Sequence, residues 1–405
     1  MLDDLPNTER SLKNITPFQW LLLLVPLSTS ISFAMDIFIP SLTDITMDFN
    51  TTASTVQWTL SIFMFGVALG QLIIGPLADR FGKKRLTIIS CIIFTLASLW
   101  CSLATSINML IVARAVQSIG ACGTYVLSYA IVRDCFEPKQ SAKLYSQMTG
   151  ISSIAPMIAP IIGGYLAYTT NTWRSSFFGL FVIGLLMLII SVLKLPETNF
   201  KHYNSNSEIN LFTILFAKNF LPYALLAATC IVALFGFCCL SPRLLIEHLD
   251  VPKQNFGYYF GLNALVLITA NLISSKLVNY FSLGYLVIAS LVLISMGSII
   301  MLLLSLYYPL NILNFLIPML IISAGVGLSV GPSAASAMRD YAHCSGSAAA
   351  VYGSLQFLIG GIVGTIVLNF SFGSATPFAV SVLISALLTI GIIIKSPNKH
   401  VTPLY

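Results

Sequence analysis

The chain has 405 residues, of which 57% are hydrophobic and only 8% are charged, and its mean hydropathy is +0.90. A soluble domain carries about 25% charged residues, so this composition excludes an ordinary soluble protein and predicts a polytopic membrane protein. The net charge is +6, but in a membrane protein the placement of the basic residues is more informative than their sum.

Long apolar runs separated by short polar breaks follow one another along the whole chain. A membrane-spanning helix needs roughly 20 apolar residues, so this length accommodates about twelve spans. We predict helices at residues 18–43, 54–77, 86–104, 107–132, 141–168, 174–195, 218–242, 254–278, 283–306, 310–336, 344–370 and 374–395. The longest polar interruption, residues 196–217, is the expected cytoplasmic linker between two six-helix halves, residues 1–195 and 218–405.

The basic residues predict the orientation of these helices. If both termini are cytoplasmic, all but four of the 20 Lys and Arg residues lie in cytoplasmic segments, the exceptions being Arg114, Arg174, Arg243 and Lys253. Because cytoplasmic loops carry the excess of Lys and Arg, we expect both the N and the C terminus inside.

The segment between the second and third predicted helices places Asp79 ahead of four basic residues, Arg80, Lys83, Lys84 and Arg85. By charge alone it would be an ordinary cytoplasmic turn. The pattern Gly75-x-x-x-Asp79-Arg80-x-Gly82-Lys83-Lys84-Arg85, however, resembles the signature loop between helices 2 and 3 of the major facilitator superfamily. The resemblance implies a secondary transporter with twelve helices, multi-pass in a bacterial inner membrane.

Two charged residues fall inside predicted spans, Asp36 in the first and Arg114 in the fourth. At about 1.5 Å per residue, both lie roughly 10–12 Å below the outer surface, so we expect them to face one cavity. Burial favours a neutral carboxyl group, whereas a nearby cation favours a carboxylate. We hypothesise that Asp36 alternates between protonated and ionised forms, with Arg114 and Gln117 tuning it. The alternative is a static Asp36–Arg114 pair that only fixes helix packing.

These residues carry a second resemblance. The run Met35-Asp36-Ile37-Phe38-Ile39-Pro40-Ser41-Leu42 looks like the first-helix element of the Bcr/CflA-like drug:proton antiporters, and Arg114-x-x-Gln117-x-x-Gly120 resembles the fourth-helix motif linked there to proton transfer. The resemblance implies that protons are the coupling ion. Ser28 stands where other drug antiporters carry an additional acid, so the resemblance leaves coupling to Asp36 alone.

The fifth predicted helix contains Gly150, Pro156, Pro160, Gly163 and Gly164. Two prolines bend a helix and small residues let a neighbour approach closely, so we expect a hinge or a tight helix contact. An ordinary kinked packing helix would have the same local features. Ala159-Pro160-x-x-Gly163-Gly164 also resembles the antiporter motif of exporters, which favours efflux.

The start of the eleventh predicted helix, Gly346-Ser347-Ala348-Ala349-Ala350, resembles the start of the same helix in the Bcr/CflA-like antiporters. The resemblance implies a cytoplasmic gate in which Asp79 lies against the positive end of this helix and Lys83 pairs with Asp134.

The substrate cavity is predicted from residues on helices that line it in this fold. Aromatic walls with few polar groups suit bulky amphipathic compounds. The candidates are Phe33, Phe38, Tyr125, Tyr129, Phe235, Phe237, Asn263 and Gln356. Each would also serve as simple packing.

Several functions find no support in the sequence. No HExxH motif, paired intramembrane carboxylates or nucleotide-binding loop appears, so we expect neither an enzyme with catalytic residues nor an ATP-driven pump. The eight cysteines form no CxxC pair and the four histidines are scattered, so we expect no metal site. We expect a monomer that uses the proton gradient without a cofactor and binds no nucleic acid. Open alternatives are transport of a specific metabolite such as a siderophore, with proton symport if it is imported, or a non-transporting receptor.

Overall fold

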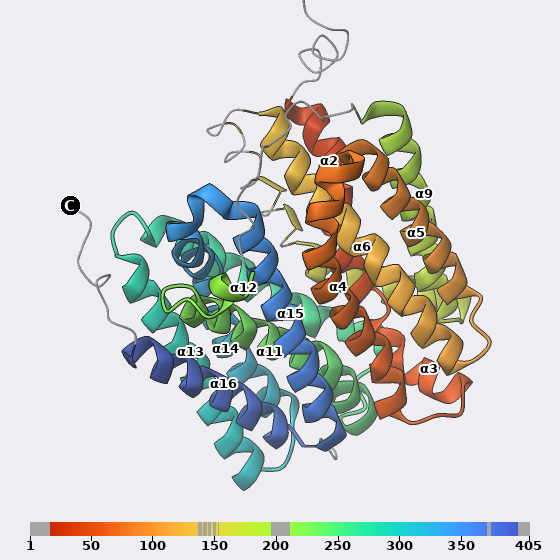
Figure 1. The fold of residues 1–405 in the computed structure, drawn as a ribbon. Coiled ribbons are helices and arrows are strands. Elements are labelled where there is room, and N and C mark those ends of the chain that lie inside the picture. The colour runs from red at the N-terminus through yellow and green to blue at the C-terminus, as the bar shows by residue number, and fades with distance from the viewer. Residues whose placement is uncertain are drawn as a thin grey trace, which may run out of the picture. The chain divides into compact units, whose positions relative to one another are not determined.

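The computed structural model describes residues 17–136, 154–195, 211–370 and 374–395, together with isolated positions at 140, 144, 147–148 and 151–152. Within these residues every regular element is helical, as the composition predicts (Figure 1). The elements are α2 (Pro17–Asp36), η1 (Ile39–Ser41), α3 (Leu42–Asp48), α4 (Ala53–Phe81), α5 (Lys83–Ser102), α6 (Ile107–Cys135), α8 (Ala155–Thr170), α9 (Arg174–Lys194), α10 (Leu211–Leu215), α11 (Leu221–Pro242), η2 (Arg243–His248), α12 (Lys253–Leu277), α13 (Leu283–Tyr307), α14 (Ile312–Met338), η3 (Arg339–Cys344), α15 (Ser345–Phe370) and α16 (Thr376–Lys395).

In the described part of the chain, 11 helices are long and apolar enough to cross a membrane. The predicted fifth helix falls partly on residues 137–153, most of which lie outside the described residues, and α8 is its described portion. Large apolar side chains point outward from these helices, as shown by Leu193 at 72% exposure and Ile394 at 73%. Such apolar surfaces fit contact with lipid.

The prediction of one continuous first helix over residues 18–43 is wrong. α2 ends at Asp36, a turn follows, and η1 and α3 complete the span. The cause is Pro40, which has no N–H to donate to the carbonyl of Asp36 four residues earlier and disfavours helical backbone at Ile39. The break therefore places Asp36 at the carboxyl end of α2.

The predicted linker is also more structured than expected. Its last residues form the short helix α10, Leu211–Leu215, which packs against α15, while residues 196–210 lie outside the described residues. The apolar sequence of α10, LFTIL, gives it a face to bury.

One compact unit comprises residues 1–38 and 69–208. Within it α5 packs against both α6 and α9, and α2 packs against α6, α8 and α9 (Figure 1). Buried side chains from four of these helices form its core, among them Trp20, Leu24, Cys91, Ile131 and Met187. This core fixes α2 and α6, the two helices that carry Asp36 and Arg114.

The other compact unit comprises residues 39–68 and 209–405. In it α14 packs against α12 and α13, and α11 packs against α15. The first part of α4 is bonded into this unit, because Gln57 Nε2 donates to the Cys239 carbonyl at 3.1 Å and Thr365 Oγ1 donates to Ser61 Oγ at 2.6 Å. A division of the chain into halves at residues 196–217 stays a prediction.

Candidate proton-coupling site

Asp36 lies where the backbone of the first span leaves the helix. Its side chain is only 6% exposed, although it is a carboxyl group in an apolar span. The last helical hydrogen bond of α2 runs from the Ile37 N–H to the Phe33 carbonyl at 3.1 Å. The carbonyl groups that follow Phe33 therefore need other partners, because a buried backbone acceptor left unbonded is costly.

Arg114, from α6, supplies one of those partners. Its guanidinium is fully buried, and Nη1 donates to the Ala34 carbonyl at 2.9 Å and to Gln117 Oε1 at 2.5 Å. The same group lies 4.7 Å from the ring centre of Phe38, on the other side of Asp36 in sequence. A cation is favourable at the carboxyl end of a helix, where the backbone dipole is negative. Arg114 thus caps α2 and holds the residues that flank Asp36.

Gln117 extends this arrangement from α6 to α5. Its Nε2 donates to Ser98 Oγ at 2.7 Å, and the Ser98 hydroxyl donates to the Phe94 carbonyl at 2.6 Å. Gly120 allows this contact, because a β-carbon there would lie only 2.5 Å from the backbone nitrogen of Phe94. The spacing of Gln117 and Gly120 by one helical turn therefore aligns the amide with Ser98. Asp36, Arg114 and Gln117, predicted from sequence as one group, are brought together.

The two charges interact. Asp36 and Arg114 lie close enough for an electrostatic interaction, and the Cys101 thiol of α5 also lies near Arg114. Burial and the negative end of the α2 dipole favour a neutral carboxyl at Asp36, whereas the guanidinium favours a carboxylate. A group subject to opposing effects of this kind can change its protonation when one of them changes, for example when water enters the site.

Sequence reasoning missed two serines that complete the contacts around α2 and α6. Ser98 accepts from Gln117, and Ser30 of α2 lies 2.7 Å from Thr124 of α6, hydroxyl to hydroxyl. Serine is common in membrane helices, and neither residue belongs to a motif. The sequence therefore carries no signal for Ser98, whose contact depends on the close packing of Gly120 against Phe94.

The fifth-helix motif lies in α8 and contacts the turn that follows Asp36. Ala159, Pro160 and Gly163 are buried, and Gly163 lies directly against the backbone of Ile37, the residue after Asp36. Pro160 is inside α8, but Pro156 lies in its first turn, where a missing N–H costs nothing. Within α8 only Pro160 is an internal proline, and a hinge at this motif stays a prediction. Gly164, half-buried, follows Gly163 in α8, and Gly150 lies outside the described residues.

The signature loop is tighter than a solvated hairpin. α4 continues to Phe81, Gly82 turns the chain with a φ of 86°, and α5 begins at Lys83. Only Gly82 leaves the helical conformation, in a backbone region that favours glycine. Lys83 is only 5% exposed, whereas Arg85 is exposed. A β-carbon at Gly75 would meet nothing within 4 Å.

Three residues of the predicted cytoplasmic gate have side chains outside the described part of the structure. Asp79 and Arg80 lie in α4 and Asp134 lies in α6, and only their backbone is described. Cys135, beside Asp134 in sequence, lies close to Lys83. Burial raises the pKa of the Cys135 thiol to about 12, and the charge of Lys83 opposes that rise. The pairing of Lys83 with Asp134 stays a prediction.

Three of the predicted cavity aromatics are fully buried against other side chains. Phe38 lies under Arg114 and packs on Phe177 with ring centres 4.9 Å apart. Phe237 stacks on Phe315 at 6.0 Å, and Phe235 packs against α15 at Gly364.

The other predicted cavity residues differ in burial and in their contacts. Asn263 is 4% exposed and its Oδ1 accepts from the Ser323 hydroxyl at 2.6 Å. Phe33, Tyr125, Tyr129 and Gln356 are half-buried, and the rings of the two tyrosines lie 5.2 Å apart. Their assignment to a substrate cavity stays a prediction.

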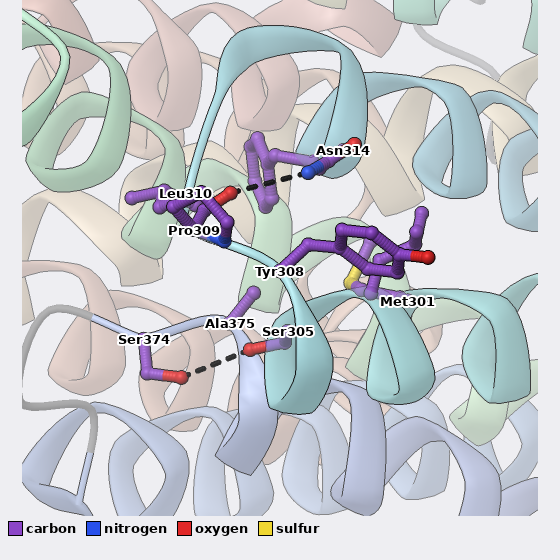
Figure 2. A pocket seen from close by; sticks show the side chains of 10 residues that line it. Met301, Ser305, Tyr308, Pro309, Leu310, Asn314, Ser374 and Ala375 are labelled. Atoms are coloured by element: carbon purple, nitrogen blue, oxygen red, sulfur yellow. Dashed lines mark hydrogen bonds between the residues drawn. The ribbon is translucent and has the colours of Figure 1, made fainter.

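A cavity of about 180 Å³ lies elsewhere, in the second unit, between the α13–α14 connection and the start of α16 (Figure 2). Figure 2 shows Ser305 bonded to Ser374 at 3.0 Å and Asn314 bonded to the Pro309 carbonyl at 3.1 Å. A drug-sized ligand needs roughly 300–1,000 Å³, so this space is too small for one. Its lining does not include the predicted site residues.

Buried charges at a broken membrane helix are typical of multi-pass transporters. Residues 24–365 match the family model of the Major Facilitator Superfamily, and the chain belongs to that family. It is 30% identical over 376 residues to a bicyclomycin resistance protein homolog of Haemophilus influenzae, covering 89% of this chain and 91% of the relative. It is 27% identical over 341 residues to the multidrug resistance protein MdtL of a Shewanella species, covering 84% and 86%.

Among solved structures, a D-xylose–proton symporter superposes with a TM-score of 0.70 at 15% identity, covering 91% of this chain and 96% of that one. This likeness shows the fold alone. The family and its relatives define the chain as a major facilitator transporter of the multi-pass membrane type, in the branch that contains the drug-resistance proteins.

Proposed function

We propose that this transporter is a proton-driven exporter of drug-like or small endogenous amphipathic molecules, and that Asp36 carries the coupling proton. The observation that supports it best is the buried Asp36 carboxyl at the end of α2, beside an Arg114 that is bonded to both α2 and Gln117. Burying a charge pair in a membrane span is expensive, and such residues usually mark an ion pathway.

The geometry supports a simple cycle. With Asp36 protonated, Arg114 keeps its bonds to the Ala34 carbonyl and to Gln117, so the site tolerates a neutral carboxyl. With Asp36 ionised, the guanidinium balances its charge. Alternating access would change the hydration of Asp36 and thus the balance between the two forms. Export coupled to proton entry follows if substrate binds the ionised form better.

The substrate class follows from the chemistry of the helices and from the relatives. The relatives are named for resistance to bicyclomycin and to multiple drugs. The half-buried aromatic residues Phe33, Tyr125 and Tyr129 would offer an apolar wall with hydroxyl groups at its edge. Such a surface suits bulky amphipathic compounds. We further propose a monomer in a bacterial inner membrane, with both termini cytoplasmic and with the proton gradient as its only energy source.

The test is flux in liposomes that contain the purified protein, under an imposed pH gradient, with ethidium, chloramphenicol and a siderophore-like acid as probes. A pH-sensitive dye reports protons while the probe is followed in parallel. Antiport predicts that probe and protons move in opposite directions. Movement in the same direction would make the protein a symporter, and the absence of coupled flux with every probe would contradict the proposal.

Asp36→Asn and Asp44→Asn form a matched pair for this assay. Asp44 is half-buried and lies eight residues further on, in α3. Coupled flux should vanish in Asp36→Asn and persist in Asp44→Asn. Full coupling in a folded Asp36→Asn would show that the Asp36–Arg114 pair is static and serves only packing.

A further inference from the structure

The break in the first span leaves the backbone around Asp36 dependent on contacts from other helices. Pro40 lacks an N–H and so cannot donate an α-helical hydrogen bond to the Asp36 carbonyl, and a turn at Ile37 and Phe38 follows α2 directly. The helices packed against this turn therefore contribute to the placement of Asp36.

Gly163 of α8 makes one of these contacts. A β-carbon built on Gly163 would overlap the carbonyl oxygen of Ile37 and would lie 2.6 Å from its carbonyl carbon. The hydrogen that glycine carries in place of a side chain is therefore directed at this oxygen, which is the geometry of a Cα–H···O contact. The hydroxyl of Ser176, from α9, lies 3.4 Å from the Gly163 carbonyl and ties this part of α8 to α9.

Residues on both sides of Asp36 are thus held from outside. Arg114 bonds the carbonyl of Ala34 and lies against the ring of Phe38, while Gly163 receives the carbonyl of Ile37. Any side chain at position 163 must push Ile37 away from α8. Because Ile37 adjoins Asp36, the carboxyl group must then move relative to Arg114.

The other charged and titratable groups near the break are few. Among the described residues, Arg114 of α6 lies within electrostatic reach of both Asp36 and Cys101 of α5. Tyr165 and Tyr168 of α8 are exposed, and Arg174 of α9 donates to the carbonyl of Ala104, in the connection that follows α5. A change in the proton binding of this site would therefore report the geometry of Asp36 and Arg114.

We propose that Gly163 is a positioning residue for the coupling carboxyl group: its missing side chain seats the Ile37 carbonyl on α8 and thereby sets the placement of Asp36 against Arg114. This inference rests on the proposed role of Asp36 in proton coupling. Gly163 of the fifth-helix motif would then do more than allow a bend in α8, because it contacts the turn that follows Asp36.

The test compares three glycine-to-alanine variants in the purified full-length protein. Gly163→Ala is the probe variant. Gly236→Ala is the packing control, since its β-carbon would lie 2.5 Å from Phe378 Cε2 in the second unit. Gly391→Ala is the neutral control, since its β-carbon meets nothing within 4 Å. The measurements are ethidium binding and the pH dependence of the proton release that ethidium causes.

The proposal predicts that Gly163→Ala still binds ethidium but shifts the midpoint of proton release by about one pH unit or more, a tenfold change in proton affinity. Gly236→Ala and Gly391→Ala should keep the wild-type midpoint, whatever Gly236→Ala does to yield or stability. A wild-type midpoint in Gly163→Ala, or an equal shift in Gly236→Ala, would overturn the proposal.

Two further results keep the test decisive. Absence of proton release from the wild-type protein with ethidium, with chloramphenicol and with the siderophore-like acid alike would refute the proposed function itself, which separates that failure from a failure of the positioning role. If Gly163→Ala is not recovered folded, Ser176→Ala replaces it, because it removes only the hydroxyl near the Gly163 carbonyl. A smaller shift in the midpoint is then expected, and an unchanged midpoint counts against the proposal.

Discussion

Replacing Arg114 by Met should destabilise the protein far more than the same change at Arg174. Both arginines donate to a carbonyl at 2.9 Å, Arg114 to Ala34 and Arg174 to Ala104, and both lie over an aromatic ring. They differ in burial, since Arg114 is fully buried and Arg174 is half-buried. The pair therefore separates the effect of burial from the effect of the arginine itself.

The expected magnitudes follow from the bonds that are lost. Arg114→Met leaves the Ala34 carbonyl and Gln117 Oε1 without this donor, and an unsatisfied buried group costs about 1–3 kcal/mol, so the total is about 2–6 kcal/mol. At Arg174 water can replace the lost donor, so the change should cost only about 0.5–1.5 kcal/mol. Adding Asp36→Asn to Arg114→Met should recover about 0.5–3 kcal/mol, because it removes a carboxyl that has lost its cation.

The assay is denaturant unfolding of the purified protein in detergent, followed by tryptophan fluorescence, under conditions where refolding is reversible. The free energy of unfolding is compared for both single variants, Asp36→Asn and the double variant. Equal losses at Arg114 and Arg174 would refute the reasoning from burial. Strict additivity of Arg114→Met and Asp36→Asn would refute the interaction between the two charges.

Three other predictions follow from individual contacts. Ser61→Ala and Thr365→Val should each lower the free energy of unfolding by about 0.5–1.5 kcal/mol, because each removes the 2.6 Å hydrogen bond between the two hydroxyl groups. The double variant should lose less than the sum of the two single losses, and a loss equal to that sum would contradict the hydrogen bond. Gly82→Ala should cost roughly 1–2 kcal/mol because of its φ of 86°, and Gly82→Asn less; melting temperatures check this order, and an unchanged Gly82→Ala value would contradict it. Burial raises the pKa of the Cys135 thiol to about 12, so Cys135 should react slowly with maleimide at pH 7 and faster as the pH rises toward 9. Lys83→Met should slow the reaction further, because it removes the charge that favours the thiolate. Rapid labelling at pH 7 would contradict the burial of this thiol.

Most helix positions were predictable because the bilayer sets helix length. The predicted helix at 283–306 corresponds to α13 at Leu283–Tyr307, and the one at 374–395 corresponds to α16 at Thr376–Lys395. Apolar runs of this length have one stable arrangement in a membrane, a helix with all backbone bonds made internally. The break after Asp36 was missed although Pro40 carries the signal, because prolines often only kink a membrane helix.

The candidate site was partly predictable for a different reason. Charged residues are rare in membrane spans, so Asp36 and Arg114 stand out in the sequence, and their similar depth predicts that they meet. The contacts of Ser98 with Gln117 and of Gly163 with Ile37 were not predictable, because they depend on how neighbouring helices pack. For the same reason the sequence does not separate Phe237, buried against Phe315, from an aromatic residue that faces a cavity.

The most direct test of the central claim is the number of protons released when ethidium saturates the purified protein in weakly buffered detergent solution. At a pH at which Asp36 is protonated in the free protein, coupling through Asp36 predicts about one proton per protein, since a ligand that favours the ionised form must expel the proton it carries. Release should be lost in Asp36→Asn and kept in Asp44→Asn. Undiminished release from a folded Asp36→Asn would contradict the account, because the proton would then come from another group.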